Sequence, residues 1–421
     1  MESWDPKTLA KRDRARAVAL AVTDRLQYSR MQPANGDFGP SLAGGDAGLA
    51  VLFGYLARCS LDDAWEKTAH AAALRMGASL AARPGPPVGL FGGLAGVAFA
   101  FWYLSHGDTR YRRARSAVED LLLPQATDLA TSFAQRRGMP VEDYDVVSGL
   151  CGVAAYLLCR SADDRALSAL AVIVEALVEI VERNESPPAW FTPASLISAR
   201  AMIGNYPEGN LNCGMAHGAS GILAILALAH QTNVPVAHLP AAIERLAHWL
   251  IDQRQTQHWG DFWPAAVGVR ASDKPTPAPI GWCYGNPGVA RALWLAGAAL
   301  RNQTIRAIAI EALRSVYRRL AMHRNAMSPT FCHGVAGVLH ITMRFANDTG
   351  LPDLRAAAED MLERLLAHYS EDAPLGYRDH DFDIGLVDRH GLLDGAAGVA
   401  LVLLAASSNQ VPDWDRIFIL S

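Results

Sequence analysis

The sequence predicts an all-α protein built as an α/α toroid, a double ring of about seven inner and seven outer helices. Three observations support this fold class: a glycine motif that recurs seven times, a nearly all-apolar run after each copy, and an amphipathic stretch between copies. A helix that is apolar on all sides is buried, so the alternation predicts an inner and an outer layer. An open α-solenoid shares this helix pairing, but inner helices as apolar as these favour closure.

The repeated motif is Gly-x-x-Gly, and it opens apolar runs such as GLAGVAFAFWYL and GAAGVALVLLA. The second glycines of successive copies are 48 to 69 residues apart. Glycine at these positions suits a tight turn into a helix or a close approach of neighbouring backbones. The seven copies begin at Gly45, Gly93, Gly149, Gly218, Gly285, Gly334 and Gly395.

The stretches between the copies have one apolar side. In residues 354–366, for example, Leu354, Met361 and Leu365 recur at helical spacing among charged residues. We therefore expect a half-exposed outer helix in each of these stretches. Six of them cover residues 6–26, 61–82, 163–183, 236–254, 302–323 and 352–367.

The repeat fills the chain, so we expect residues 1–421 to form a single domain. The two widest intervals between copies contain aromatic and proline-rich stretches at residues 186–212 and 258–281. Long loops on a rigid scaffold often carry function. We expect these two stretches to be loops or a small inserted element that caps one end.

Composition excludes several classes of protein. With 51% hydrophobic and 19% charged residues the chain is not disordered, and its net charge of −4 argues against binding to nucleic acid or to an anionic membrane. The N-terminal residues do not form a secretory signal, and the apolar runs of about a dozen residues are too short for a transmembrane segment. We therefore expect a soluble, cytoplasmic protein.

The repeat also aligns candidate functional residues, because equivalent positions lie at the same end of an inner ring. Cys283 and Cys332 occupy the same position of adjacent copies, and His333 follows Cys332 directly. Zinc binds thiolate and imidazole readily, and helix N-termini favour the thiolate form. This shared position predicts a zinc site rather than two packed core cysteines. The remaining cysteines are expected in the core: Cys59, Cys151, Cys159 and Cys213.

A second group of residues is suited to proton transfer. His217 precedes the first glycine of its copy without a neighbouring cysteine, so it is a candidate general acid or base. Asp145, just before the third copy, could reach the same end or cap a helix. Tyr284 could donate a proton or pack. The polar run 379–383, with Asp388 and His390, reads as a polar loop.

Three motifs resemble the lanthionine synthetase C-like family: Trp-Cys-Tyr-Gly at 282–285, Cys-His-Gly at 332–334 and Ala-His-Gly at 216–218. The similarity runs from about residue 41 to residue 406. It implies an α/α toroid with one zinc ion per chain, bound by Cys283, Cys332 and His333. It also implies acid–base roles for His217 and Asp145, with Tyr284 adjacent. The implied activity is the addition of a peptide cysteine thiol to dehydroalanine or dehydrobutyrine, which forms a lanthionine or methyllanthionine ring.

The resemblance also implies partners. Because no kinase-like or lyase-like portion accompanies the repeat, the chain resembles a stand-alone cyclase. Its expected partners are a precursor peptide with its leader, a separate dehydratase and an export transporter. One departure concerns Pro279, where family members of the bacterial type often carry an arginine. Arg270 or Lys274 could substitute for it.

Three other functions remain open at this level. A zinc-dependent prenyltransferase would need an aspartate ligand and a basic diphosphate pocket, and no Lys/Arg cluster accompanies the motifs. A relative that binds glutathione or a protein partner would carry the same motifs. A purely structural zinc site normally has four protein ligands rather than three. The sequence does not name the precursor peptide or its ring pattern.

Overall fold

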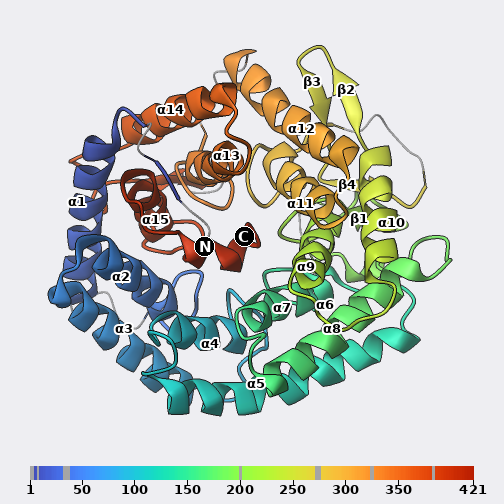
Figure 1. The fold of residues 1–421 in the computed structure, drawn as a ribbon, viewed down its shortest axis with the longest axis horizontal. Coiled ribbons are helices and arrows are strands. Elements are labelled where there is room, and N and C mark those ends of the chain that lie inside the picture. Colours follow the sequence, from blue (N-terminus) through green and yellow to red (C-terminus); the bar gives the residue numbers. More distant parts are fainter. Residues whose placement is uncertain are drawn as a thin grey trace. The chain divides into compact units, whose positions relative to one another are not determined.

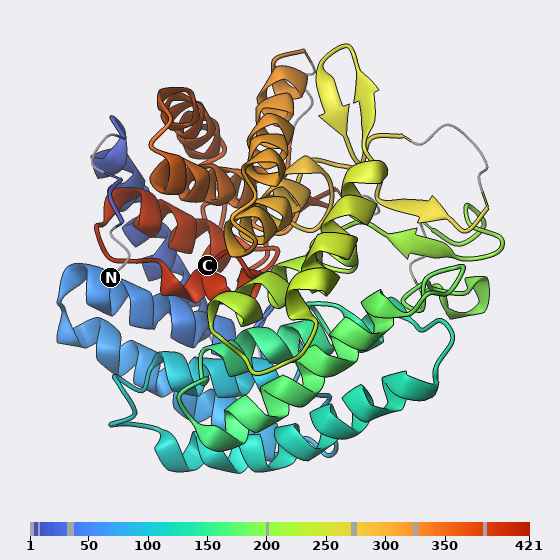
Figure 2. The same cartoon turned by 45° about the vertical axis from the view of Figure 1, so that its right-hand side comes forward.

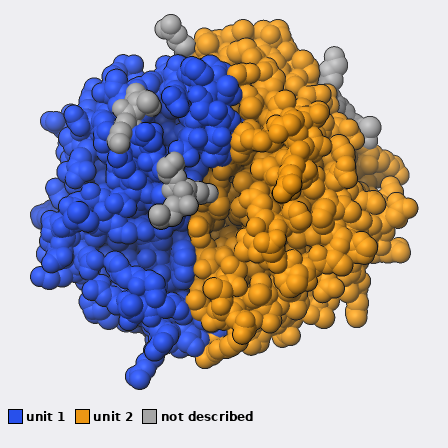
Figure 3. Space-filling view, in the orientation of Figure 1, with its two compact units in different colours: residues 1–87, 91–119, 325–415 blue, residues 88–90, 120–324, 416–421 orange. Residues whose placement is uncertain are grey.

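The structure, a computed structural model, describes residues 4–6, 9–31, 38–198, 202–270, 276–322, 327–381 and 385–421. The chain divides into two compact units, which Figure 3 colours separately. Unit 1 comprises residues 1–87, 91–119 and 325–415, and unit 2 comprises residues 88–90, 120–324 and 416–421.

Each Gly-x-x-Gly motif is followed by a buried helix, as expected. These helices are α2 (Asp46–Ser60), α4 (Leu94–Tyr103), α7 (Leu150–Leu158), α9 (Ala219–Gln231), α11 (Asn286–Ala299), α13 (Val335–Thr349) and α15 (Ala396–Ser407). Most of their residues are buried on every side, because they are apolar all round.

Half-exposed helices alternate with the buried ones. They are α1 (Arg12–Met31), α3 (Asp63–Ala81), α5 (Arg112–Ser132), α8 (Asp164–Glu182), α10 (Leu239–Asp252), α12 (Gln303–Met322) and α14 (Pro352–Ala367). Six of them coincide with the expected amphipathic stretches. The additional one, α5, contains Pro124 in its interior, where proline usually interrupts a helix.

The two glycines of each motif have different structural roles. The first glycine is the N-cap of the buried helix in all seven copies. The second glycine lies in the first turn, where a Cβ atom would be less than 3.0 Å from the main-chain oxygen six residues earlier and within 3.4 Å of a side chain of another copy. No side chain fits in this space. The positions described in this way are Gly48, Gly152, Gly221, Gly288 and Gly398.

Main-chain hydrogen bonds connect successive copies at the position two residues before the first glycine. In unit 1, Cys332 N–H donates to Leu393 O, Leu393 N–H to Ala43 O, and Ala43 N–H to Phe91 O. These bonds are 2.9 to 3.1 Å long, and each donor lies one copy before its acceptor. The last copy is thus bonded directly to the first.

Unit 2 contains a similar arrangement. Ala216 N–H donates to Cys283 O at 3.2 Å, and Val146 N–H, one residue before the aligned Val147, donates to Ala216 O at 3.0 Å. The residues that the repeat aligns in the sequence are therefore neighbours in space within each unit.

Most half-exposed helices pack more extensively against the buried helix that precedes them than against the one that follows. In unit 2, α8 packs on α7, α10 on α9 and α12 on α11. In unit 1, α3 packs on α2 and α14 on α13, while α1 packs on α15, the last helix of the repeat. In Figure 1, α3 lies beside α2, α14 beside α13 and α1 beside α15.

Unit 2 also contains short antiparallel strand pairs. Strand β1 (Asn210–Asn212) pairs with β4 (Ala266–Gly268), and β2 (Gln255–Gln257) pairs with β3 (Gly260–Phe262). The first pair joins the two stretches 186–212 and 258–281. In Figure 2, the yellow strands β2, β3 and β4 stand beyond the helices of unit 2. The short helix α6 (Val141–Tyr144) precedes α7, and unit 1 has one pair, β5 (Asp379–Asp381) with β6 (Gly385–Val387).

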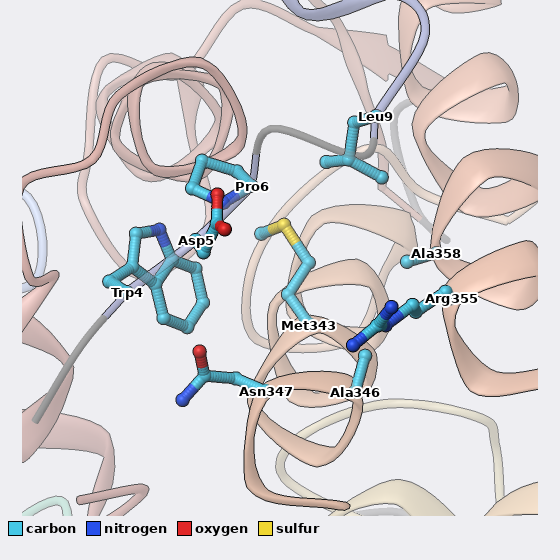
Figure 4. A pocket seen from close by; sticks show the side chains of 9 residues that line it. All are labelled: Trp4, Asp5, Pro6, Leu9, Met343, Ala346, Asn347, Arg355 and Ala358. Carbon is cyan, nitrogen blue, oxygen red and sulfur yellow. The ribbon is translucent and has the colours of Figure 1, made fainter. Parts of the chain in front are cut away.

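The N-terminal segment is attached to unit 1 through Trp4. Its Nε1 donates to the carbonyl of Ala405 at 2.8 Å, and its ring lies under the guanidinium of Arg344. A pocket of about 260 Å³ lies between this segment and helices α13 and α14, with Asp5 and Arg355 on its two sides (Figure 4). None of the predicted site residues lines it.

Across the described residues, no helix combines the length and the apolar character that crossing a bilayer requires.

The close approach at the second glycine gives a stability prediction. In Gly48→Ala the new Cβ would lie 2.5 Å from Leu42 O and 3.0 Å from Leu392 Cβ. We expect a loss of about 1–3 kcal/mol in the free energy of unfolding, typical of overpacking, despite alanine's higher helix propensity. Chemical denaturation measures it. Gly44→Ala is the control, because nothing lies within 4 Å of a Cβ at Gly44. Equal stabilities of the two variants would contradict the packing argument.

Candidate functional site

Unit 2 brings His217 and Asp145 together. His217 Nδ1 lies 2.6 Å from Asp145 Oδ2. Asp145 is the C-cap residue of the short helix α6. His217 directly follows Ala216, whose main-chain N–H donates to Cys283 O. A carboxylate only accepts hydrogen bonds, so Nδ1 carries the proton and Nε2 is the nitrogen left for chemistry.

Asp145 also fixes the start of helix α7. Its Oδ1 accepts the main-chain N–H groups of Ser148 at 2.6 Å and Gly149 at 2.9 Å. Its side chain is 1% exposed, whereas that of His217 is 32% exposed, so only the imidazole is open to solvent. Burial alone would lower the pKa of His217, but the hydrogen bond and the charge of Asp145 outweigh burial and raise that pKa.

Tyr284 lies beside His217, with ring centroids 5.9 Å apart. Its hydroxyl is oriented by Asn212, a residue that the sequence did not single out. Asn212 Oδ1 accepts the N–H of Gly214 at 2.9 Å, so its Nδ2 is the group that donates to Tyr284 Oη at 3.1 Å. The phenol oxygen therefore accepts this bond, and its own proton points elsewhere.

The turn that carries Cys283 is anchored on both sides. Before it, Trp282 Nε1 donates to the carbonyl of Phe418 at 2.9 Å, and beyond it the buried Arg291 donates to Leu420 O at 2.7 Å. After Cys283, the chain turns at Gly285 with φ of +82°, a conformation that strains other residues. These contacts fix the course of the main chain on both sides of Cys283, and the residue itself is 9% exposed.

Unit 1 contains Cys332 and His333 at the start of helix α13. Cys332 is half-buried, and its main-chain N–H is bonded to Leu393. The turn is closed by a bond of 2.8 Å from Val335 N–H to Ser328 O. The His333 side chain is 37% exposed, and its Nε2 lies 3.5 Å from Asp379 Oδ1.

Asp379 corrects the interpretation of residues 379–383 as a polar loop. It begins strand β5, and its side chain is only 2% exposed. Burial alone would raise its pKa, but hydrogen bonds from His333 and Ser328 lower the pKa to about 2, so the carboxyl group is ionised. The sequence could not reveal this, because a buried carboxylate in a short strand resembles any acidic loop residue. Asp383 lies outside the described residues.

The proposed metal ligands are distributed over both units. Cys283 belongs to unit 2, whereas Cys332 and His333 belong to unit 1. Within the parts of the chain that the structure describes, no group of three or more His, Cys, Asp or Glu side chains forms a metal site.

The other four cysteines have different surroundings. Cys151 and Cys213 are buried, and burial raises the pKa of both thiols, that of Cys213 to about 12. They are therefore poor thiolate donors. Cys59 and Cys159 are half-buried.

The region around Pro279 does not contain the arginine of the bacterial pattern. Arg270 is 80% exposed and pairs with Glu208 at 2.9 Å, and Lys274 lies outside the described residues. Next to Pro279, the carbonyl of Ala278 accepts a hydrogen bond of 2.8 Å from Arg319 of helix α12.

Comparisons with known proteins agree with the resemblance. The family model described as lanthionine synthetase C-like protein matches residues 36–419. The nisin biosynthesis protein NisC of Lactococcus lactis subsp. lactis is 24% identical over 329 residues, covering 75% of this chain and 72% of that protein. A solved structure of nisin cyclase superposes with a TM-score of 0.81 at 20% identity, covering 94% of this chain and 96% of the other. The predicted α/α toroid is thereby confirmed, and the chain belongs to the lanthionine synthetase C-like family.

Proposed function

We propose that this protein is a zinc-dependent lanthipeptide cyclase. It would add cysteine thiols of a precursor peptide to dehydroalanine or dehydrobutyrine in the same peptide, forming thioether rings. The observation that carries the proposal is the pairing of His217 and Asp145 directly beside the Cys283 turn. Membership of the family and the relative's name, a nisin biosynthesis protein, supply the substrate class.

The proposed zinc ligands are Cys283, Cys332 and His333. Two thiols and one imidazole suit zinc, and three protein ligands leave a fourth position for a substrate. The orientation of His333 toward Asp379 supports this role, because metal-binding histidines usually direct their second nitrogen to a carboxylate. When bound, zinc would favour the thiolate form of a peptide cysteine at neutral pH.

His217 is the proposed proton donor. Addition of the peptide sulfur to the β-carbon of the dehydro residue leaves an enolate, and its α-carbon must then receive a proton. The raised pKa of His217 keeps the imidazole protonated to higher pH than usual. Because Nδ1 is held by Asp145, the transferred proton would leave from Nε2.

Asp145 and Tyr284 have supporting roles in this proposal. Asp145 orients the His217 ring and stabilises its positive charge, as the carboxylate does in a catalytic triad. Tyr284 can donate its hydroxyl proton to the substrate while Asn212 holds the oxygen. The proposed partners are a precursor peptide with its leader, and the dehydratase and exporter that act before and after ring formation.

Removal of a proposed ligand should release the metal. We expect about one zinc per chain in the wild-type protein and sharply less in Cys283→Ala and in Cys332→Ala, because two remaining protein ligands bind zinc weakly. Elemental analysis after desalting measures this. Cys59→Ala and Cys159→Ala are the controls and should keep the metal. Full zinc occupancy in either ligand variant would disprove the assignment.

Replacement of the proton donor should slow the reaction without releasing zinc. We expect His217→Ala to lose about 10²–10⁴-fold in turnover, the usual contribution of a general acid. Ring formation leaves the mass of a dehydrated peptide unchanged but removes its alkylatable thiols, so alkylation followed by mass spectrometry measures it. Loss of zinc from this variant would make His217 a ligand instead. An inactive wild-type protein would contradict the proposed activity.

The pH dependence should reveal the charge of Asp145. The rate should fall as the pH rises through the pKa of His217, since the general acid must be protonated. In Asp145→Asn this decline should begin at lower pH, because the variant lacks the charge that raises the pKa. Asp143→Asn is the matched control, since Asp143 pairs with Arg136. An unshifted profile in Asp145→Asn would assign the proton to another group.

A further inference from the structure

The two histidines of the Xaa-His-Gly motifs face their carboxylates through different ring nitrogens. His217 presents Nδ1 to Asp145 at 2.6 Å, whereas His333 presents Nε2 to Asp379 at 3.5 Å. The motifs are alike in sequence, and both histidines directly precede the glycine that caps a buried helix. The difference therefore arises from where each carboxylate lies, not from the motif.

Asp379 is held firmly enough to impose this orientation. Its Oδ1 accepts the main-chain N–H of His380 at 2.8 Å, and its Oδ2 accepts Arg389 Nη1, also at 2.8 Å. Arg389 in turn lies 3.4 Å from Asp394, the residue that precedes the first glycine of the last copy. The carboxylate is thus buried and accepts N–H donors on both of its oxygens.

Because both oxygens of Asp379 already accept N–H donors, the carboxylate faces the ring as a hydrogen-bond acceptor, and the ring nitrogen turned toward it is the one that carries the proton. For His333 this is Nε2, which leaves the lone pair of the neutral ring on Nδ1. We infer that Asp379 is a positioning residue that holds His333 as the Nε2–H tautomer, so that Nδ1 is the atom presented to zinc. This inference rests on the proposed function, because it assumes that His333 is a zinc ligand.

The same reasoning gives the two histidines separate tasks. His333 would use Nδ1 for the metal, and His217 would use Nε2 for the proton. A metal-bound histidine must be neutral, whereas a general acid must be charged. Asp379 serves the first condition by fixing the tautomer, and Asp145 serves the second by stabilising the imidazolium.

Zinc affinity provides the first test. Carboxylates that orient a metal-binding histidine typically contribute about 10–100-fold to affinity. We expect Asp379→Asn and Asp379→Ala to bind zinc 10–100-fold more weakly than wild-type protein in competition with a chromophoric chelator. Asp388→Asn is the matched control, because Asp388 follows the partner strand and pairs with Arg378. Wild-type affinity in both Asp379 variants would overturn the inference, and so would zinc loss as complete as in Cys332→Ala, since Asp379 would then be a ligand.

The tautomer itself provides a second test that needs no Asp379 variant to fold. In zinc-loaded wild-type protein labelled with ¹⁵N-histidine, long-range ¹H–¹⁵N spectra should show His333 with a protonated Nε2 and a metal-shifted Nδ1. His333→Gln identifies the signals by their disappearance. Zinc on Nε2 would overturn the inference but leave the proposed function intact. A wild-type protein that binds no zinc would instead refute the proposed zinc site, and the inference with it.

Discussion

The close approach of neighbouring chain segments at the second glycine of each motif is the constraint on which the rest of this structure depends. At the five second glycines named above, a side chain would collide with a main-chain oxygen six residues earlier and with a neighbouring copy. Its absence lets the main chains come near enough for hydrogen bonds to run from copy to copy. Residues at a fixed offset from the glycines are then brought side by side within a unit, as Ala216 and Cys283 are.

Two buried carboxylates show how this scaffold orients histidine side chains. Asp145 and Asp379 are each anchored by main-chain N–H groups before they reach a histidine. Main-chain donors do not rotate, so each carboxylate has little freedom, and each histidine inherits its orientation. Strand β1 acts similarly on Tyr284 through Asn212. The helices therefore supply the positions, while short strands and turns supply the groups that orient the side chains.

Much of the fold could be predicted from the sequence because the glycine motif reports a packing requirement at each copy. The seven glycine caps follow from it, as does the proximity of Ala216 and Cys283 within unit 2. Helix α5 was harder to find, since Pro124 interrupts its pattern. The closer packing of most half-exposed helices on the preceding buried helix could not be read from periodicity, which identifies an apolar side but not what covers it. Asp379 was missed for a related reason, because burial of a short polar strand depends on distant segments.

The packing of α1 against α15 has a consequence for synthesis of the protein. Helix α1 leaves the ribosome before every other helix of the repeat, yet α15, the helix that packs against it, follows all of them. Contacts between such distant segments form slowly, because the intervening chain must first be ordered. The side of α1 that faces α15 therefore stays uncovered until the last repeat emerges, and transiently exposed apolar surface of this kind is prone to aggregation.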